Sequence, residues 1–208
     1  MKIAVFGATG GSGRAIVSQA LAAGNEVTAF TRNPSALEPH TGLRIVAGEI
    51  EEQAAVGKAI AGNEAVLCAL GGRPWRRRER VCSTAVSNIL PMMVKHGVRR
   101  IVAISTFGAG ETRAQVDWFP RIVLFGLVLR SEVADKEAME IQLAASEALW
   151  TVVRVGVLTD EPPRGNWRAA DDGSIRGMGR IARADVAGFM LAQLDSEVWV
   201  RRKPVIMY

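Results

Sequence analysis

The segment Gly7–Gly13 reads GATGGSG and directly follows the short apolar run Lys2–Phe6. Glycines at positions 7, 10 and 13 have the spacing of the turn that joins a strand to a helix in dinucleotide-binding proteins. The first glycine permits a sharp turn, the second lets the backbone approach a pyrophosphate, and the third lets the helix pack closely on the strand. A purely structural turn is the alternative, but the strand before it and the helix after it favour nucleotide binding.

Strands and helices alternate along the rest of the chain. Short runs rich in Val, Ile, Ala and Leu predict strands at Lys2–Phe6, Glu26–Thr31, Leu43–Ala47, Ala65–Leu70, Arg100–Ser105 and Trp150–Val155. Helical spacing predicts helices at Gly13–Ala23, Glu51–Ala61, Arg80–His96 and Ser131–Ser146. We therefore expect an α/β fold in which a doubly wound parallel sheet, a Rossmann fold, has strands buried on both faces. Residues 1–208 are expected to form one NAD(P)-binding domain, with a small substrate-side region in the loops after the fourth to sixth strands.

Composition excludes several classes of protein. With 208 residues, 49% of them hydrophobic and only 2 cysteines, the chain is neither disordered nor a disulfide-stapled miniprotein. The net charge is +5, and 21 of the 26 basic residues are arginines. Arginine favours fixed, planar contacts with anions over a diffuse positive charge.

The sequence also suggests a compartment. The longest strongly apolar run, Ile122–Leu129, is far shorter than the ~20 residues of a membrane span, and the amino terminus lacks a signal-peptide pattern. Cys68 and Cys82 are expected to be buried thiols, which favours a cytoplasmic protein. The only histidines are His40, in a loop, and His96, at a helix end, so we expect no metal site.

The end of the second predicted strand indicates which dinucleotide is bound. The sequence there is FTRNP, in which Arg32 stands where an NAD-binding protein has a carboxylate for the ribose. An arginine at this point suits the 2′-phosphate of NADP (NADPH), so NADP is favoured over NAD. A solvated loop arginine is the alternative reading.

The chain resembles the atypical short-chain dehydrogenase/reductases over nearly its whole length. The motifs that carry the resemblance are GATGGSG, TRNP, VAGEIEE, VLCALGG, ISTFGAG, DKEAMEIQLAASEALWTVVRVGVLTDEP and RADVAGFMLAQL. It is most similar to the NAD(P)H-binding proteins related to biliverdin reductase B (flavin reductase), with the NmrA-like redox sensors as near neighbours. The resemblance implies that these residues bind the cofactor: Gly7, Thr9, Gly10, Gly11, Ser12, Gly13, Arg32, Glu49, Ile50, Leu70, Gly71, Arg73, Ser105 and Val157.

Two departures from the family pattern bear on the chemistry. If Lys136 is the lysine of the Tyr-x-x-x-Lys dyad, the tyrosine position holds Glu132, and the only tyrosine is Tyr208. Val157 stands where the biliverdin reductase B subgroup has a histidine. We therefore expect either hydride transfer from NADPH to a planar flavin- or quinone-like acceptor, or a non-enzymatic NADP(H) sensor that acts through a protein partner.

Ser105 is the expected catalytic residue. The resemblance implies that it lies beside the nicotinamide and bonds the carboxamide or the substrate, whereas a strand-end hydroxyl that bonds backbone is the alternative. Lys136 is expected to bond the ribose hydroxyls or to pair with Glu140 one turn later.

The loops at the carboxyl ends of the strands suggest the substrate. Trp75, Trp118 and Trp167 either flank a planar substrate or cover the core under long loops. A cluster of arginines in GRPWRRRER is read as a solvated loop or an anion clamp in preference to a nucleic-acid site; it comprises Arg73, Arg76, Arg77, Arg78 and Arg80. The run Ile122–Leu129 is expected to be a partly exposed apolar helix near the substrate. We expect a monomer or homodimer that binds a planar or anionic small molecule, with no nucleic acid and no membrane.

Overall fold

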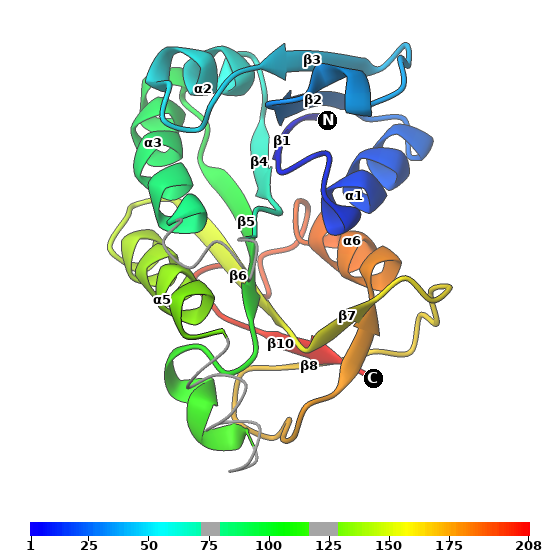
Figure 1. The fold of residues 1–208 in the computed structure, drawn as a ribbon, viewed down its shortest axis with the longest axis vertical. Coiled ribbons are helices and arrows are strands. Elements are labelled where there is room, and N and C mark those ends of the chain that lie inside the picture. Colours follow the sequence, from blue (N-terminus) through cyan, green and yellow to red (C-terminus); the bar gives the residue numbers. More distant parts are fainter. Residues whose placement is uncertain (72–79, 117–128) are drawn as a thin grey trace.

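In the computed structural model, which describes residues 1–71, 80–116 and 129–208, eight strands form one sheet and two more form a small second sheet (Figure 1). The strands are β1 (Lys2–Phe6), β2 (Glu26–Thr31), β3 (Leu43–Ala47), β4 (Ala65–Cys68), β5 (Arg100–Thr106), β6 (Leu149–Val155), β7 (Val157–Thr159), β8 (Arg168–Ala170), β9 (Arg180–Ala182) and β10 (Val205–Met207). The helices are α1 (Gly11–Ala22), α2 (Gln53–Ile60), α3 (Val81–His96), α5 (Arg130–Ala144) and α6 (Arg183–Ala192), with 3-10 turns η1 (Pro34–Ala36) and η2 (Gly110–Gln115).

The strand order of the main sheet is β3-β2-β1-β4-β5-β6-β10-β8. Every pair in this order is parallel except β10 with β8, and β7 pairs with β9 in the small sheet. The order reverses between β1 and β4, which is the point where open α/β sheets bind ligands at the carboxyl ends of their strands. The predicted doubly wound, single-domain α/β fold is confirmed.

Helices cover both faces of the sheet, as Figure 1 shows, with α2, α3 and α5 on one side and α1 and α6 on the other. Alternate residues of β1 serve the two layers: Ala4 and Phe6 pack with the first group, and Ile3 and Val5 pack with the second. All four side chains are buried completely. A strand with apolar side chains on both faces is therefore required at this position, which explains the unbroken apolar run.

The predicted elements differ from the observed ones in three respects, the first of which is that the helix α6 was not predicted. β3 lies at the edge of the sheet and its residues are half-buried or exposed, so the expectation that all strands are buried on both faces is wrong there. The strands after β6 have only three residues each and were not predicted as elements. Runs of that length carry too little periodicity to distinguish a strand from a loop.

Two local predictions are confirmed, for the cysteines and for the end of α3. Cys68 and Cys82 are buried free thiols, and α3 ends at His96 before Gly97, whose φ is +70°. Within the described residues, no helix has the length and apolar character needed to cross a bilayer.

A carboxylate from one helix caps the start of another. Asp135 of α5 is buried and accepts hydrogen bonds from the backbone amides of Cys82 and Ser83, at 2.8 and 2.9 Å, and from the Ser83 hydroxyl. The first turn of α3 has no side-chain cap of its own. Asp135 therefore satisfies amides that would otherwise be orphaned and fixes α5 against α3 beside the carboxyl ends of β4 and β5.

The junction of β1 and α1 is packed without room for side chains. Gly7 has a φ of +82°, and a Cβ there would lie 2.7 Å from the carbonyl oxygen of Ala69. A Cβ at Gly13 would lie 2.0 Å from the carbonyl oxygen of Gly7. Both contacts are with backbone atoms, so neither position can accept another residue without moving a strand or a helix.

We expect Gly13→Ala to lower the free energy of unfolding by about 3 kcal/mol, because the added methyl group must push α1 away from the turn. Urea denaturation followed by circular dichroism measures this change. Gly188→Ala in α6 is the matched control, since a Cβ there meets only the Gln19 side chain, at 3.4 Å. That control should be neutral or stabilising by up to about 1 kcal/mol, and equal stability of both variants would contradict the packing argument.

Candidate functional site

Three consecutive backbone amides at the start of α1 are free. The amide of Gly10 bonds the carbonyl of Gly7 at 3.0 Å, and that of Arg14 bonds the carbonyl of Gly10 at 2.8 Å. Across the described ranges, the intervening amides at positions 11, 12 and 13 have no hydrogen-bond acceptor. Free amides at a helix start, together with the positive end of the helix dipole, form an anion site. This one lies at the switch point of the sheet.

Two arginines accompany these amides. Arg14 donates from Nε to the carbonyl oxygen of Thr9 at 3.0 Å, which places its guanidinium on the glycine-rich turn. Arg32 follows β2 and lies 4.0 Å from the carboxylate of Glu49, and both side chains are more than half exposed. An exposed pair at this distance contributes little to stability, so Arg32 is available to another anion.

The predicted adenine side is assembled next to Arg32. Ile50 is buried, and its carbonyl oxygen accepts a hydrogen bond of 2.9 Å from the Asn88 side chain of α3. The structure thus brings Arg32, which follows β2, next to the segment after β3 that contains Glu49 and Ile50. Their roles toward a cofactor stay predictions.

Lys136 holds two strand ends together at the predicted nicotinamide side. Its ammonium donates to the carbonyl oxygens of Leu70 and Ile104, each at 2.7 Å, and the side chain is buried. The alternative that Lys136 pairs with Glu140 is wrong, because Glu140 points to other partners. Lys136 instead links the segment after β4, through Leu70, to β5, through Ile104.

Ser105, at the end of β5, donates its hydroxyl proton to a buried carboxylate. The hydroxyl lies 2.6 Å from Oε1 of Glu140, so the alternative of a bond to backbone is wrong. Nε of Arg154, on the neighbouring strand β6, donates to the same oxygen at 3.1 Å. Because its proton is committed to Glu140, Ser105 can offer the site only lone pairs and acts there as a hydrogen-bond acceptor.

Glu111 is a second carboxylate partner of Arg154, besides Glu140. Arg154 is 1% exposed and also donates to both oxygens of Glu111 in η2, at 2.7 and 3.0 Å. Hydrogen bonds from Arg154 lower the pKa of Glu111 to about 2. The Lys203 ammonium lies 3.4 Å from Glu140. A buried arginine between two carboxylates joins β5, β6, α5 and η2 at the carboxyl edge of the sheet.

Arg154 was not predicted as a site residue, and Glu140 was expected only as a partner of Lys136. Arg154 interrupts an apolar strand, LWTVVRV, and a single arginine there is the only signal that a buried carboxylate lies nearby. Nothing in the local sequence indicates which carboxylate it is.

The remaining titratable groups near Lys136 are not nucleophiles. Burial raises the pKa of both thiols, that of Cys82 to about 12, so Cys68 and Cys82 stay protonated. Glu132, at the position of the missing tyrosine, is half-buried, and burial raises the pKa of its carboxyl although Lys136 opposes the shift.

The described part of the substrate side contains one of the predicted tryptophans. Trp167 packs edge-on against Phe189 with ring centroids 4.9 Å apart, which favours its alternative role as a cover of the core. Val157 is 44% exposed on β7, and Gly71 is exposed after β4. The following predicted residues lie outside the described ranges: Trp75, Trp118, Arg73, Arg76, Arg77, Arg78 and residues 122–128.

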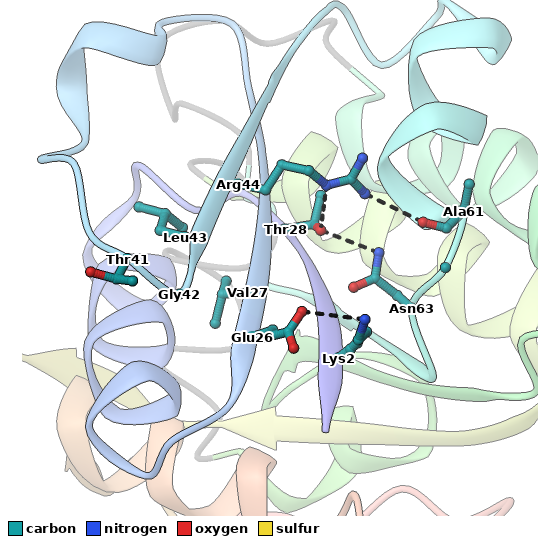
Figure 2. A pocket seen from close by; sticks show the side chains of 11 residues that line it. Lys2, Glu26, Val27, Thr28, Thr41, Gly42, Leu43, Arg44, Ala61 and Asn63 are labelled. Atoms are coloured by element: carbon teal, nitrogen blue, oxygen red, sulfur yellow. Dashed lines mark hydrogen bonds and ion pairs between the residues drawn. The ribbon is translucent and has the colours of Figure 1, made fainter.

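A cavity of about 410 Å³ lies at the amino ends of β1, β2 and β3, away from the carboxyl ends where the candidate site lies (Figure 2). Its polar groups bond one another: Thr28 accepts from Arg44 at 3.2 Å and from Asn63 at 3.3 Å. Ligands of doubly wound folds gather at the carboxyl ends of the strands, so this cavity is not part of the candidate site.

Comparison with known proteins identifies the type of fold and the family. A family model described as NAD(P)H-binding matches residues 7–197. An uncharacterised chloroplastic protein of Arabidopsis thaliana is 31% identical over 181 residues, which cover 79% of this chain. The chain spans 62% of the length of that relative.

Solved structures agree with this assignment. ChuY of Escherichia coli, described as an anaerobillin reductase, superposes with a TM-score of 0.82 at 21% identity, covering 100% of this chain and 97% of that one. A short-chain dehydrogenase/reductase of Veillonella parvula in complex with NADP superposes with a TM-score of 0.80 at 15% identity, covering 100% and 94% of the two chains. At these identities the likeness shows the fold alone.

We expect Glu140→Gln to lower the free energy of unfolding by about 3 kcal/mol, because it leaves the buried Arg154 without its nearest counter-charge. Urea denaturation measures the change. Glu147→Gln is the control, since that side chain is 99% exposed and its pair with Arg201 is solvated. Equal stability of the two variants would show that the buried pair does not hold these elements together.

Proposed function

The chain belongs to the NAD(P)H-binding family, and on that premise we propose that it is an NADPH-dependent reductase of the atypical short-chain type. The acceptor is a planar, flavin- or quinone-like molecule. The observation that carries the proposal is the free amide triplet at the start of α1, at the switch point of a doubly wound sheet.

The residues at the glycine-rich turn fit a dinucleotide. Gly10 has no atom closer to its Cβ position than the carbonyl oxygen of Gly7, at 3.4 Å, so the backbone is open to a phosphate there. Gly13 brings the helix start against the turn. The closely packed glycines and the free amides together match the requirements of a pyrophosphate.

Arg32 supports NADPH over NADH. It is exposed after β2, and its pair with Glu49 is long and solvated, so it can exchange Glu49 for a more highly charged 2′-phosphate. Arg14 adds a second positive charge on the glycine-rich turn.

The arrangement of Ser105 and Lys136 favours an acceptor that needs no side-chain acid. NADPH, when bound, supplies a hydride. Ser105 donates its proton to Glu140, and Lys136 donates to two carbonyl groups, so both are positioning groups instead of proton donors. A flavin or quinone can take its proton from water, and its reduction depends mainly on a stacked orientation. We place the acceptor at the carboxyl ends of β4, β5 and β6.

A non-enzymatic NADP(H) sensor is the second candidate. The same commitment of Ser105 and Lys136 favours it, because a sensor needs to bind the cofactor but not to protonate a product. The two buried free thiols are consistent with a reducing, cytoplasmic setting for either function.

We expect the protein to oxidise NADPH when FMN, riboflavin or a small quinone is added, seen as a loss of absorbance at the wavelength of the reduced nicotinamide. Turnover with any of these acceptors supports the reductase. Binding of NADPH with unchanged absorbance in the presence of all acceptors identifies the sensor, and failure to bind NADPH rejects both candidates.

Arg32→Gln is expected to raise the dissociation constant for NADPH about tenfold, because a charge-assisted bond to the 2′-phosphate is lost. The dissociation constant for NADH should stay the same, since NADH lacks that phosphate. Quenching of tryptophan fluorescence measures both. Arg99→Gln, an exposed arginine at the amino end of β5, is the control. An equal loss for NADH and NADPH would contradict the assignment of Arg32.

A further inference from the structure

One arginine at the glycine-rich turn belongs to a distant part of the sequence. Arg183 is the first residue of α6, and its Cδ and Nε lie 2.7 Å from the position that a Cβ at Gly11 would occupy. Gly11 is not one of the three glycines of the turn pattern. Its lack of a side chain is explained by this contact, because any larger residue would displace the arginine from the start of α1.

A solvated carboxylate holds the Arg183 guanidinium. Nη1 donates to Oδ1 of Asp160 at 2.7 Å. The Asp160 side chain is 87% exposed, whereas that of Arg183 is 28% exposed. Water competes with such a pair on the aspartate side, so the pair contributes little stability and can be exchanged at low cost.

Arg183 lies between groups of both signs: Asp185 is in the same first turn of α6 and Asp160 pairs with the guanidinium, whereas the helix starts nearby are positive. It lies in the first turn of α6, where the helix dipole is positive, and beside the start of α1, where three amides are free. A positive charge at a helix start is destabilising unless an anion lies close by. The Arg183 side chain therefore lies beside the free amides at the start of α1, and together they favour a strongly negative ligand.

We propose that Arg183 binds the pyrophosphate of the dinucleotide, exchanging Asp160 for a phosphate when the ligand enters. The inference rests on the proposed function, since it needs a dinucleotide at the glycine-rich turn. Asp160 directly follows β7. Arg32 then recognises the 2′-phosphate and Arg183 the pyrophosphate.

The assignment of Arg183 to the pyrophosphate is tested by measuring how the Arg183→Gln variant binds two ligands, NADP⁺ and adenosine 2′-monophosphate. NADP⁺ carries both phosphate groups, whereas adenosine 2′-monophosphate lacks the pyrophosphate. Titration calorimetry or displacement of NADPH fluorescence should show about tenfold weaker binding of NADP⁺ and unchanged binding of adenosine 2′-monophosphate. Arg183→Lys keeps the charge without the planar fork and should lose less affinity.

Two controls accompany that variant. Arg180→Gln removes an arginine of β9 whose side chain is 65% exposed and pairs with Glu161 at 3.5 Å, and it should bind both ligands normally. Asp160→Asn removes the competing carboxylate and should bind NADP⁺ at least as tightly as the unchanged protein.

Three results would overturn the assignment. Normal NADP⁺ binding by Arg183→Gln excludes a contact with the pyrophosphate, and equal losses for both ligands indicate a general disturbance of the site. Weakening by Asp160→Asn as large as that by Arg183→Gln shows that the pair itself is required, which excludes the exchange. If the unchanged protein binds neither ligand, the proposed function fails and the assignment fails with it.

Discussion

The close approach of Gly13 to the carbonyl oxygen of Gly7 determines how the rest of the site is built. Since no Cβ fits between them, α1 begins directly at the carboxyl end of β1 and its first amides stay free. Gly7 is pressed in turn against the carbonyl of Ala69, which ties the turn to the segment after β4. These two backbone contacts place a helix start at the point where the strand order reverses, a combination that suits an anion even without a charged side chain.

A buried charge network lies at the carboxyl ends of β5 and β6. Arg154 of β6 is neutralised by Glu140 of α5 and by Glu111 of η2, and Glu140 also takes the proton of Ser105. Burying an arginine is costly, so each of its partners has to be held in position by the surrounding packing. The hydroxyl of Ser105 is thereby fixed as an acceptor. The same network that stabilises the carboxyl edge of the sheet limits the chemistry that this edge can perform.

The excess of arginine over lysine in the sequence is reflected in the contacts of three arginines. Arg14 of α1 is oriented by a backbone carbonyl oxygen and Arg183 of α6 by a carboxylate oxygen, whereas Arg32, after β2, is exposed in a long pair with Glu49. A guanidinium that is already oriented loses little further freedom when it binds a phosphate. The planar fork of arginine suits such fixed contacts better than the ammonium of lysine.

The alternation of strands and helices up to β6 and the glycine-rich turn between β1 and α1 were readable from the sequence. Each depends on residues within about one element of one another, where spacing and local backbone preference decide the outcome. The partners of Ser105 and Lys136, the burial of Arg154 and the contact between Arg183 and Gly11 were not readable, and neither were the three-residue strands after β6. Arg183 and Gly11 are joined only because α1 and α6 pack on the same face of the sheet, and Ser105 meets Glu140 only because α5 covers β5. Local sequence determined the glycine-rich turn and the main strands and helices up to β6. Packing across the sheet decided which charges meet, because electrostatic partners are chosen by proximity in space and not along the chain.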